Sequence, residues 1–322
     1  MRLGITVDMR NSNPEHRGDV EHYQVWLDRV ARAEQLGCPS VWLTEHHFFD
    51  DGYLPQCWTL AAAIAARTST IRIGTAVALL PLHLAIEVAE QVALVDILSG
   101  GRVDPGFGVG YRKPEYDAFG GNFKQRYGEF RRRIVEMREL WGEQPGAPRT
   151  ITPRPVQRPV PIWGGFRGPQ GARLAGRLGL GLLSIERDLL EPYRAGLEEG
   201  GHDPAIARMG GLVDIWITDD PDRTWAQIEP FVAQRWQSYN RYMFEGTRLE
   251  HTRNDYFDAR TTRDSTVMGD AATVAEVLRT RFEGLPVTDI HCWTEHPGLD
   301  DDTIDANIEA ICTQLVPLLA DA

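Results

Sequence analysis

The sequence predicts an α/β fold in which eight parallel strands close into a (β/α)8 barrel, a TIM barrel. Three observations lead to this prediction: eight short apolar runs recur along the 322 residues, segments with helical periodicity separate them, and no linker divides the chain. Strands that alternate with helices form parallel sheets, and eight such units can close a barrel. An open, doubly wound sheet is the alternative. Because one such barrel accounts for about 250 residues or more, we expect residues 1–322 to form a single domain.

The predicted strands are short runs rich in β-branched or apolar residues. In chain order they cover residues 2–7, 40–44, 71–77, 102–109, 160–163, 181–185, 211–217 and 288–293.

Helical periodicity is clear in the segments between these runs. Residues 20–36 carry one apolar stripe, with Asp19 placed to cap the helix and Gly37 suited to the position after its end. Residues 126–141 carry a second stripe, with apolar side chains at steps of three and four. The last predicted helix opens with the acidic run of residues 300–302, which suits the positive end of a helix dipole.

Two segments are expected to be insertions in the barrel. Residues 142–159, after strand four, are rich in proline and glycine and fit a long connection better than a domain boundary. Residues 239–268, near strand seven, are polar and weakly periodic, so we expect a second insertion there, in the position of a lid.

The composition argues against several classes of partner. A net charge of −12 disfavours nucleic acid and anionic membranes. The N-terminus meets charged residues too early for a signal peptide, and the most apolar stretch, residues 75–95, contains a proline, a histidine and two glutamates, so it does not span a bilayer. Four scattered cysteines lack metal-ligand spacing, which favours reduced thiols and a cytoplasmic protein. These are Cys38, Cys57, Cys292 and Cys312.

The second strand ends in Glu45, His46 and His47, at the face where such barrels carry their active sites. Two histidines beside a carboxylate suit a metal site, an acid/base device or a surface loop. Adjacent residues of a regular strand point to opposite faces, so His46 and His47 cannot both enter the barrel. No HExxH-type pair adds further ligands. We therefore predict no metal.

Two later stretches are rich in glycine. In PIWGGFRGPQGARLAGRLG (161–179) a strand runs through glycines into a helix that begins near Pro169. A phosphate would fit such a helix start, with Arg167 nearby, although a tight turn is an equally good explanation. In GFGVGYRKPEYDAFGG (106–121) the alternate glycines do not match GxGxxG. They either leave room for a flat ligand at the barrel mouth or relieve crowding inside a narrow barrel.

Together these stretches resemble the bacterial luciferase-like flavin-dependent monooxygenase family. The motifs that carry the resemblance follow the family order over nearly the whole chain. They are VWLTEHHF (41–48), IGTAVALLPLH (73–83), AEQVALVDILSGGR (89–102), GVGYRKPEYDAFG (108–120), PVQRPVPIWGGFRGP (155–169) and HPGL (296–299).

The resemblance implies a barrel, usually homodimeric, that uses FMN at the C-terminal ends of its strands. Many members receive reduced FMN from a separate NAD(P)H-dependent flavin reductase, form a flavin hydroperoxide with O2 and oxygenate a small organic substrate. The residue corresponding to His46 lies beside the flavin and the substrate, and an imidazole exchanges protons near neutral pH. A hydrogen-bonded structural histidine is the alternative for His46.

The resemblance also implies a flavin site. A non-prolyl cis peptide under the isoalloxazine would join Ala76 and Val77, and Arg126 matches an arginine that follows the AFG motif. Pro105, Leu180 and Phe166 depart from the family's habit, and Phe166 is large enough to crowd the phosphate. The predicted cofactor contacts are Ala76, Val77, Gly108, Tyr111, Arg126, Gly164, Gly165, Phe166 and Gly168.

Four strand-end residues are candidates for substrate contact: Asp8, Met9, Arg112 and Trp293. We predict an FMN-dependent monooxygenase with His46 as its catalytic residue. Two alternatives remain open at this point: a deazaflavin-dependent dehydrogenase or reductase on the same barrel, and a non-catalytic flavin-binding protein.

Overall fold

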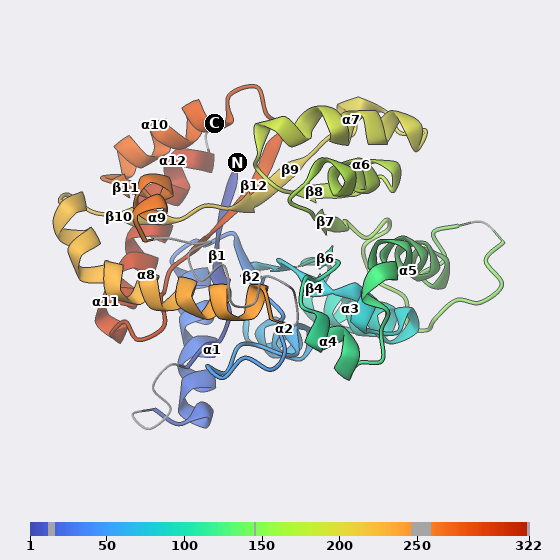
Figure 1. Cartoon of the computed structure of the whole chain (residues 1–322), viewed down its shortest axis with the longest axis horizontal. Coiled ribbons are helices and arrows are strands. Elements are labelled where there is room, and N and C mark those ends of the chain that lie inside the picture. Colours follow the sequence, from blue (N-terminus) through green and yellow to red (C-terminus); the bar gives the residue numbers. More distant parts are fainter. Residues whose placement is uncertain (12–16, 145, 246–258, 321–322) are drawn as a thin grey trace.

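The computed structural model describes residues 1–11, 17–144, 146–245 and 259–320. Ten strand segments form one sheet that curls around a central axis (Figure 1), in the order β4-β6-β7-β8-β9-β12-β1-β2-β3-β5, and their pairings are parallel. The segments are β1 (Arg2–Val7), β2 (Ser40–Leu43), β3 (Arg72–Thr75), β4 (Ala78–Leu79), β5 (Val103–Asp104), β6 (Gly106–Gly108), β7 (Trp163–Gly165), β8 (Gly181–Leu183), β9 (Met209–Leu212) and β12 (Val287–Trp293).

The third and fourth barrel strands are each split into two segments. The peptide bond between Ala76 and Val77, which separates β3 from β4, is cis, as the resemblance implies. Pro105 separates β5 from β6 because proline has no N–H for the ladder. Since β3 pairs with β5 and β4 pairs with β6, the ten segments are eight strands in a closed ring. The predicted (β/α)8 barrel is confirmed.

Helices surround the barrel (Figure 1). They are α1 (Asp19–Gln35), α2 (Cys57–Arg67), α3 (Ala85–Ser99), α4 (Lys113–Ala118), α5 (Arg126–Leu140), α6 (Pro169–Arg177), α7 (Leu190–Glu199), α8 (Pro221–Met243), α9 (Ala259–Ser265), α10 (Ala271–Phe282), α11 (Asp301–Ala310) and α12 (Val316–Ala320), with a π-helical stretch, Ile311–Leu315, before α12. Among the described helices, none has a stretch both long and apolar enough to cross a bilayer.

The predicted helix ends are mostly correct. Residues 20–36 and 126–141 correspond to α1 and α5, and Gly37, with φ of +90°, follows α1 in the left-handed conformation. The predicted cap is wrong: Gly18 is the N-cap, and Asp19 is the first helical residue. The Asp19 carboxylate instead accepts a hydrogen bond from Asn11 (3.2 Å) and lies near the positive end of the helix dipole.

Both predicted insertions lie where the sequence places them. Residues 142–159 connect α5 to β7, and residues 239–268 fall between barrel strands β9 and β12, although 246–258 lie outside the described residues. The continuous strand predicted at 211–217 is wrong, because the chain leaves the barrel after β9. It then forms β10 (Ile215–Ile217), which pairs in parallel with β11 (Val267–Gly269) in a separate two-stranded sheet.

Aromatic rings fill part of the barrel. The Trp42 ring packs edge-on against Trp163 (centroids 6.2 Å apart) and stacks on His291 (5.1 Å), and all three residues are buried. Glycine at position 74 makes this possible, because any Cβ there would collide with the Trp42 indole. A closely packed barrel interior of this kind leaves the mouth at the C-terminal strand ends as the place for a ligand.

Candidate active site

His46 lies just beyond the end of β2, held between two polar side chains. Its Nδ1 is 2.9 Å from Oε1 of Glu115, and its Nε2 is 3.0 Å from the Tyr111 hydroxyl. An ionised carboxylate can only accept, so Nδ1 carries the proton, and Nε2 accepts a hydrogen bond from the Tyr111 O–H. The arrangement fixes both the tautomer and the orientation of the imidazole.

Aromatic rings surround this histidine. The rings of Phe49, Tyr53 and Tyr111 each lie 5.0 Å from the His46 ring, with Tyr239 at 6.5 Å. His46 is only 7% exposed. Burial raises the pKa of the Tyr53 and Tyr111 hydroxyls well above their usual value, so both phenols stay neutral. His46 therefore lies in a nearly dry environment in which hydrogen bonds and charges act strongly.

Glu115, in α4, belongs to the site although no sequence pattern marks it. Its side chain is fully buried, and besides His46 its Oε1 accepts from the His47 backbone N–H (3.0 Å) and from Arg112 (3.3 Å). The position lies 69 residues from His46, in a short helix whose sequence shows no sign of a buried acid. Only the fold brings the pair together.

His47 points into a different cluster from His46. The Glu45 carboxylate accepts hydrogen bonds from His47 Nε2 (3.0 Å) and His83 Nε2 (2.5 Å) through Oε1, and from the Leu79 N–H (3.0 Å) through Oε2. Burial alone would raise the pKa of Glu45, but the hydrogen bonds from His47 and His83 outweigh it and lower the pKa to about 2.

In the described part of the chain, Glu45, His47 and His83 are the three residues whose ligand atoms lie close enough together to hold a metal ion. Direct hydrogen bonds already join them, so the cluster is complete as a hydrogen-bonded network. That the protein holds no metal remains a prediction. The two histidines do separate as expected, but the reason is different, because β2 ends at Leu43 and both lie beyond the strand.

The cis peptide lies against two of the predicted flavin contacts. A Cβ on Gly108 would come within 2.5 Å of the Val77 side chain, and a Cβ on Gly165 would also collide with it. Two roles were open to the alternate glycines: room for a flat ligand or relief of crowding. For Gly108 the structure shows relief of crowding, against the Val77 side chain. Gly108 and Gly165 thus make room for the Val77 side chain at the mouth of the barrel, beside the end of β7.

The predicted phosphate loop leads into a helix without a side-chain cap. Gly168 precedes α6, no side chain caps the helix, and its first turn contains no acid. Arg126 stacks on the rings of Phe123 (4.1 Å) and Tyr127 (5.2 Å), and its buried Nε has no hydrogen-bond partner among the described residues. Tyr127 in turn stacks on Phe166, so Arg126 approaches this loop.

Phe166 and Gly164 contribute to the core beneath this loop. The Phe166 ring is 4% exposed and packs against Phe130 and the backbone of Gly171, where a Cβ would collide with it. The ring therefore turns inward and does not crowd the loop surface. Gly164 is also buried, which leaves the backbone from Gly165 to Gly168 for a ligand.

The four predicted substrate contacts are all buried. Asp8 lies 3.2 Å from the guanidinium of Arg10, and Met9 has a φ of +62°. The Trp293 ring lies under the guanidinium of Arg235 (4.1 Å).

Arg112 is engaged by protein groups. It donates to the His47 carbonyl oxygen and to Glu245, and its guanidinium stacks on Phe49 and Tyr242. The fold brings two further arginines, Arg10 and Arg235, to the same face, although no sequence motif marks either of them.

The sequence matches a family profile described as Luciferase-like monooxygenase over residues 1–289. Among curated relatives, the oxygenase component of a flavin-dependent trigonelline monooxygenase from Acinetobacter baylyi is 27% identical, with 100% of this chain and 96% of that protein covered. An F420-dependent hydroxymycolic acid dehydrogenase from Mycobacterium tuberculosis is 34% identical, with 65% of this chain and 64% of that protein covered. This chain spans only 42% to 64% of the length of the first three curated relatives that it matches.

A solved structure has a similar fold. The monooxygenase RslO1 from Streptomyces bottropensis superposes with a TM-score of 0.80 at 22% identity, over 98% of this chain and 99% of that one. The relatives thus include both flavin-dependent monooxygenases and F420-dependent dehydrogenases. With the family profile matched over most of its length, the chain belongs to the luciferase-like monooxygenase family.

Proposed function

We propose that the protein is an FMN-dependent monooxygenase that receives reduced FMN from a separate NAD(P)H-dependent flavin reductase and oxygenates a small organic substrate. The observation that carries the proposal is the placement of His46 between Glu115 and Tyr111, within a shell of aromatic rings. When bound, reduced FMN would supply the two electrons that activate O2. A site that excludes water protects such chemistry from side reactions.

The residues at the barrel mouth fit FMN. The helix start at Pro169, Gly168 before it and the Arg126 Nε, which lacks a hydrogen-bond partner in the described part of the chain, would hold the phosphate. Val77, with Gly108 and Gly165 behind it, would support the ring system. His46 would then move a proton at Nε2, either directly or through the Tyr111 hydroxyl, while Glu115 stabilises the imidazolium.

Rapid mixing tests this function. Protein carrying reduced FMN is mixed with oxygenated buffer, and the flavin absorbance is followed with and without a set of aldehydes, ketones and sulfonates. We expect a transient species before full reoxidation and oxygen from ¹⁸O2 in a product. Monophasic reoxidation at the rate of free FMN, with no labelled product, would contradict the proposal.

A deazaflavin-dependent dehydrogenase is the second candidate, because a carboxylate–imidazole pair such as Glu115–His46 also suits removal of the hydroxyl proton of an alcohol during hydride transfer. Two of the relatives are named as F420-dependent dehydrogenases, so the binding of FMN has to be compared with that of F420. Fluorescence titration with FMN and with F420 separates the two candidates. A clear preference for F420 would replace the first proposal with the second.

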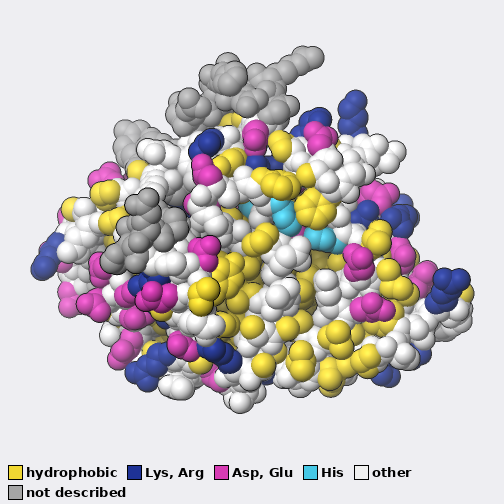
Figure 2. Space-filling view, turned by 90° about the horizontal axis from the view of Figure 1, so that it is seen from below, with side chains coloured by type: hydrophobic (Ala, Val, Ile, Leu, Met, Phe, Trp, Pro, Cys, Tyr) yellow, Lys and Arg dark blue, Asp and Glu magenta, His cyan; other side chains and the backbone are white. Residues whose placement is uncertain are grey.

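We also propose that the chain forms a homodimer through α3. Leu94, Leu98 and Ile86 on this helix are 50%, 57% and 44% exposed, and Leu84, just before it, is 60% exposed. Figure 2 shows apolar side chains gathered on the face seen from below. Large apolar side chains exposed together on one helix mark a protein–protein interface more often than a free surface.

Light scattering coupled to gel filtration tests the dimer. The wild-type protein is expected at twice the mass of one chain, and Leu94→Glu with Leu98→Glu is expected as a monomer, because the charges would have to be buried in the interface. Replacing the exposed Ile206, which lies outside α3, with Glu is the control. A monomeric wild-type protein would rule out the dimer.

A further inference from the structure

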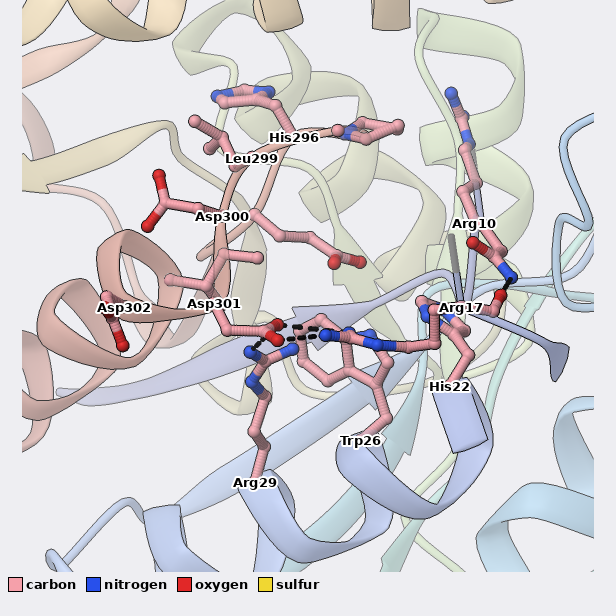
Figure 3. A pocket seen from close by; sticks show the side chains of 15 residues that line it. Arg10, Arg17, His22, Trp26, Arg29, His296, Leu299, Asp300, Asp301 and Asp302 are labelled. Atoms are coloured by element: carbon pink, nitrogen blue, oxygen red, sulfur yellow. Dashed lines mark hydrogen bonds and ion pairs between the residues drawn. The ribbon is translucent and has the colours of Figure 1, made fainter. Parts of the chain in front are cut away.

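A cavity of about 440 Å³ lies between the segments that follow β1 and β12 and the helices α1 and α11 (Figure 3). Its volume is within the range of small-molecule sites. The cavity is separate from the Val77 and Gly168 region. Residues from all four elements line it, including Arg10, His22, Trp26, Glu295, His296 and Asp301.

Arg10 is the unusual side chain of this cavity. It is 2% exposed, and its guanidinium stacks on the rings of Tyr239 (4.4 Å) and Tyr53 (4.6 Å). Its charge has two acidic neighbours, Asp8 at 3.2 Å and Asp51 at 3.7 Å. None of its three nitrogens, however, has a hydrogen-bond partner among the described residues. Buried guanidinium donors are rarely left unpaired, since doing so is costly.

A second buried guanidinium lies beside the first. Arg235 donates to the Glu295 carbonyl oxygen, its Nη2 is 4.0 Å from the Asp8 carboxylate, and its Nε and Nη1 have no hydrogen-bond partner in the described structure. Asp8 therefore lies close to two cations. Burial raises the pKa of Glu295 well above its usual value and also raises the pKa of Asp51, which weakens the negative charge available to balance the two arginines.

Two of the acids at the other end of the cavity, Asp300 and Asp301, are already engaged. Asp300 caps α11 by accepting from the Thr303 N–H (2.8 Å) and hydroxyl (2.9 Å), and Asp301 binds Arg17 and Arg29. Figure 3 shows Asp301 between Arg17 and Arg29, with Arg10 apart from this group and on the other side of the view from Asp302. At the Arg10 end, by contrast, the guanidinium nitrogens have no hydrogen-bond partner among the described residues.

We propose that this cavity binds the carboxylate of a small organic acid, with Arg10 as the principal ligand. The guanidinium of Arg10 offers paired N–H groups that match a carboxylate, and such bonds are among the strongest in proteins. The same molecule would meet other buried groups that lack partners in the described structure, namely Glu295 Oε1, His296 Nδ1, His22 Nε2 and Trp26 Nε1.

The proposed carboxylate site at Arg10 lies close to His46. The Tyr53 ring contacts both residues: it lies 5.0 Å from the His46 ring and 4.6 Å from the Arg10 guanidinium. One aromatic side chain therefore separates the two sites. The substrate class that follows is an organic acid anchored at Arg10 with its reacting end toward His46, an assignment that rests on the proposed function.

Calorimetric titration of the flavin-free protein with benzoate and with benzamide tests the site, because the two probes share a shape and differ in charge. We expect benzoate to bind about ten- to a hundredfold more tightly. Arg10→Gln should abolish this difference. The control Arg194→Gln, at an exposed position of α7, should preserve it. Equal binding of the two probes by the wild-type protein, or an unchanged preference in folded Arg10→Gln, would overturn the proposal.

A second variant covers the case in which Arg10→Gln does not fold. Arg10→Lys keeps the charge but loses the paired donors, so benzoate should bind it more weakly than the wild-type protein yet still ahead of benzamide. Undiminished benzoate binding by Arg10→Lys would also overturn the proposal. FMN affinity is measured separately by fluorescence. A protein that binds FMN but not benzoate would contradict only the carboxylate site, whereas one that binds benzoate but fails in oxygenation would contradict only the proposed function.

Discussion

Replacing Glu115 with alanine is expected to lower the free energy of unfolding by about 3–5 kcal/mol, the typical effect of removing one partner from a buried ion pair. The carboxylate accepts from His46 Nδ1, the His47 N–H and the Arg112 guanidinium. Its removal leaves three buried donors without this acceptor. Arg112, which is 1% exposed, then keeps Glu245, which is half-buried, as its one charged partner among the described residues.

Urea denaturation of the wild-type protein and two variants measures this effect. The matched control is Glu129→Ala in α5, where the partly exposed carboxylate pairs with Arg132, whose side chain is 57% exposed, and with the less exposed Arg133. Surface pairs contribute about 0–1 kcal/mol, so the control should change stability little. If Glu115→Ala were no more destabilised than Glu129→Ala, the buried acceptor would have no structural role.

Glu115→Gln separates the role of the charge from the role of the shape. Glutamine can still accept from His46 and His47, so the fold should be kept, but the negative charge that stabilises the His46 imidazolium is lost. We expect oxygenation to slow by about a hundredfold, within the range of general acid–base effects, with FMN affinity unchanged. A variant that oxygenates at the wild-type rate would show that Glu115 only supports the structure.

The barrel was predictable from the sequence because its cause is local. Each strand is a short apolar run and each helix carries its own stripe, whereas the break at Pro105 inside the strand predicted at 102–109 appears only in the structure. The strand predicted at 211–217 was wrong for a reason that is not local. The partner of β10 is β11, about 50 residues further along the chain, and that pairing draws residues 215–217 out of the barrel.

The candidate site divides in the same way. His46 could be singled out because it follows a predicted strand and lies in a motif. Glu115 could not, because its burial depends on how α4 folds back over the β2 end. Arg10 lies two residues beyond Asp8, but its lack of hydrogen-bond partners in the described structure results from the packing of Tyr53 and Tyr239 around it. Sequence patterns locate strand ends, whereas the charge balance of a buried cluster depends on contacts between distant segments.

Acid is expected to destabilise the protein through His291, which lies inside the barrel. The imidazole stacks on Trp42, its Nδ1 is 2.7 Å from the Thr6 hydroxyl, and it is 4% exposed. Burial lowers the pKa of His291 to about 3, against its usual value near 6.5. The folded protein therefore holds this ring in its neutral form over most of the acidic range.

The sign of the effect follows from proton uptake. Between the two pKa values the unfolded chain binds a proton at this position and the folded protein does not, so stability falls as the pH is lowered below about 6.5. Each pH unit costs about 1.4 kcal/mol, so the loss reaches about 3 kcal/mol at about pH 4.5 and approaches 5 kcal/mol at about pH 3. The pKa of the Glu45 carboxylate is lowered from 4.5 to about 2, so this group begins to lose its stabilising effect only as the pH falls below about 4.5.

Urea denaturation at about pH 7 and about pH 4.5 isolates this contribution when the wild-type protein is compared with His291→Gln. Glutamine can still bond to Thr6 but takes up no proton, so the variant should lose about 3 kcal/mol less than the wild-type protein between the two conditions. Every other titrating group is common to both proteins and cancels in the difference. His202→Gln, at a partly exposed position outside the barrel core, should behave like the wild-type protein. An equal loss in the wild-type protein and His291→Gln would mean that the folded barrel accepts a charged imidazole beside Trp42.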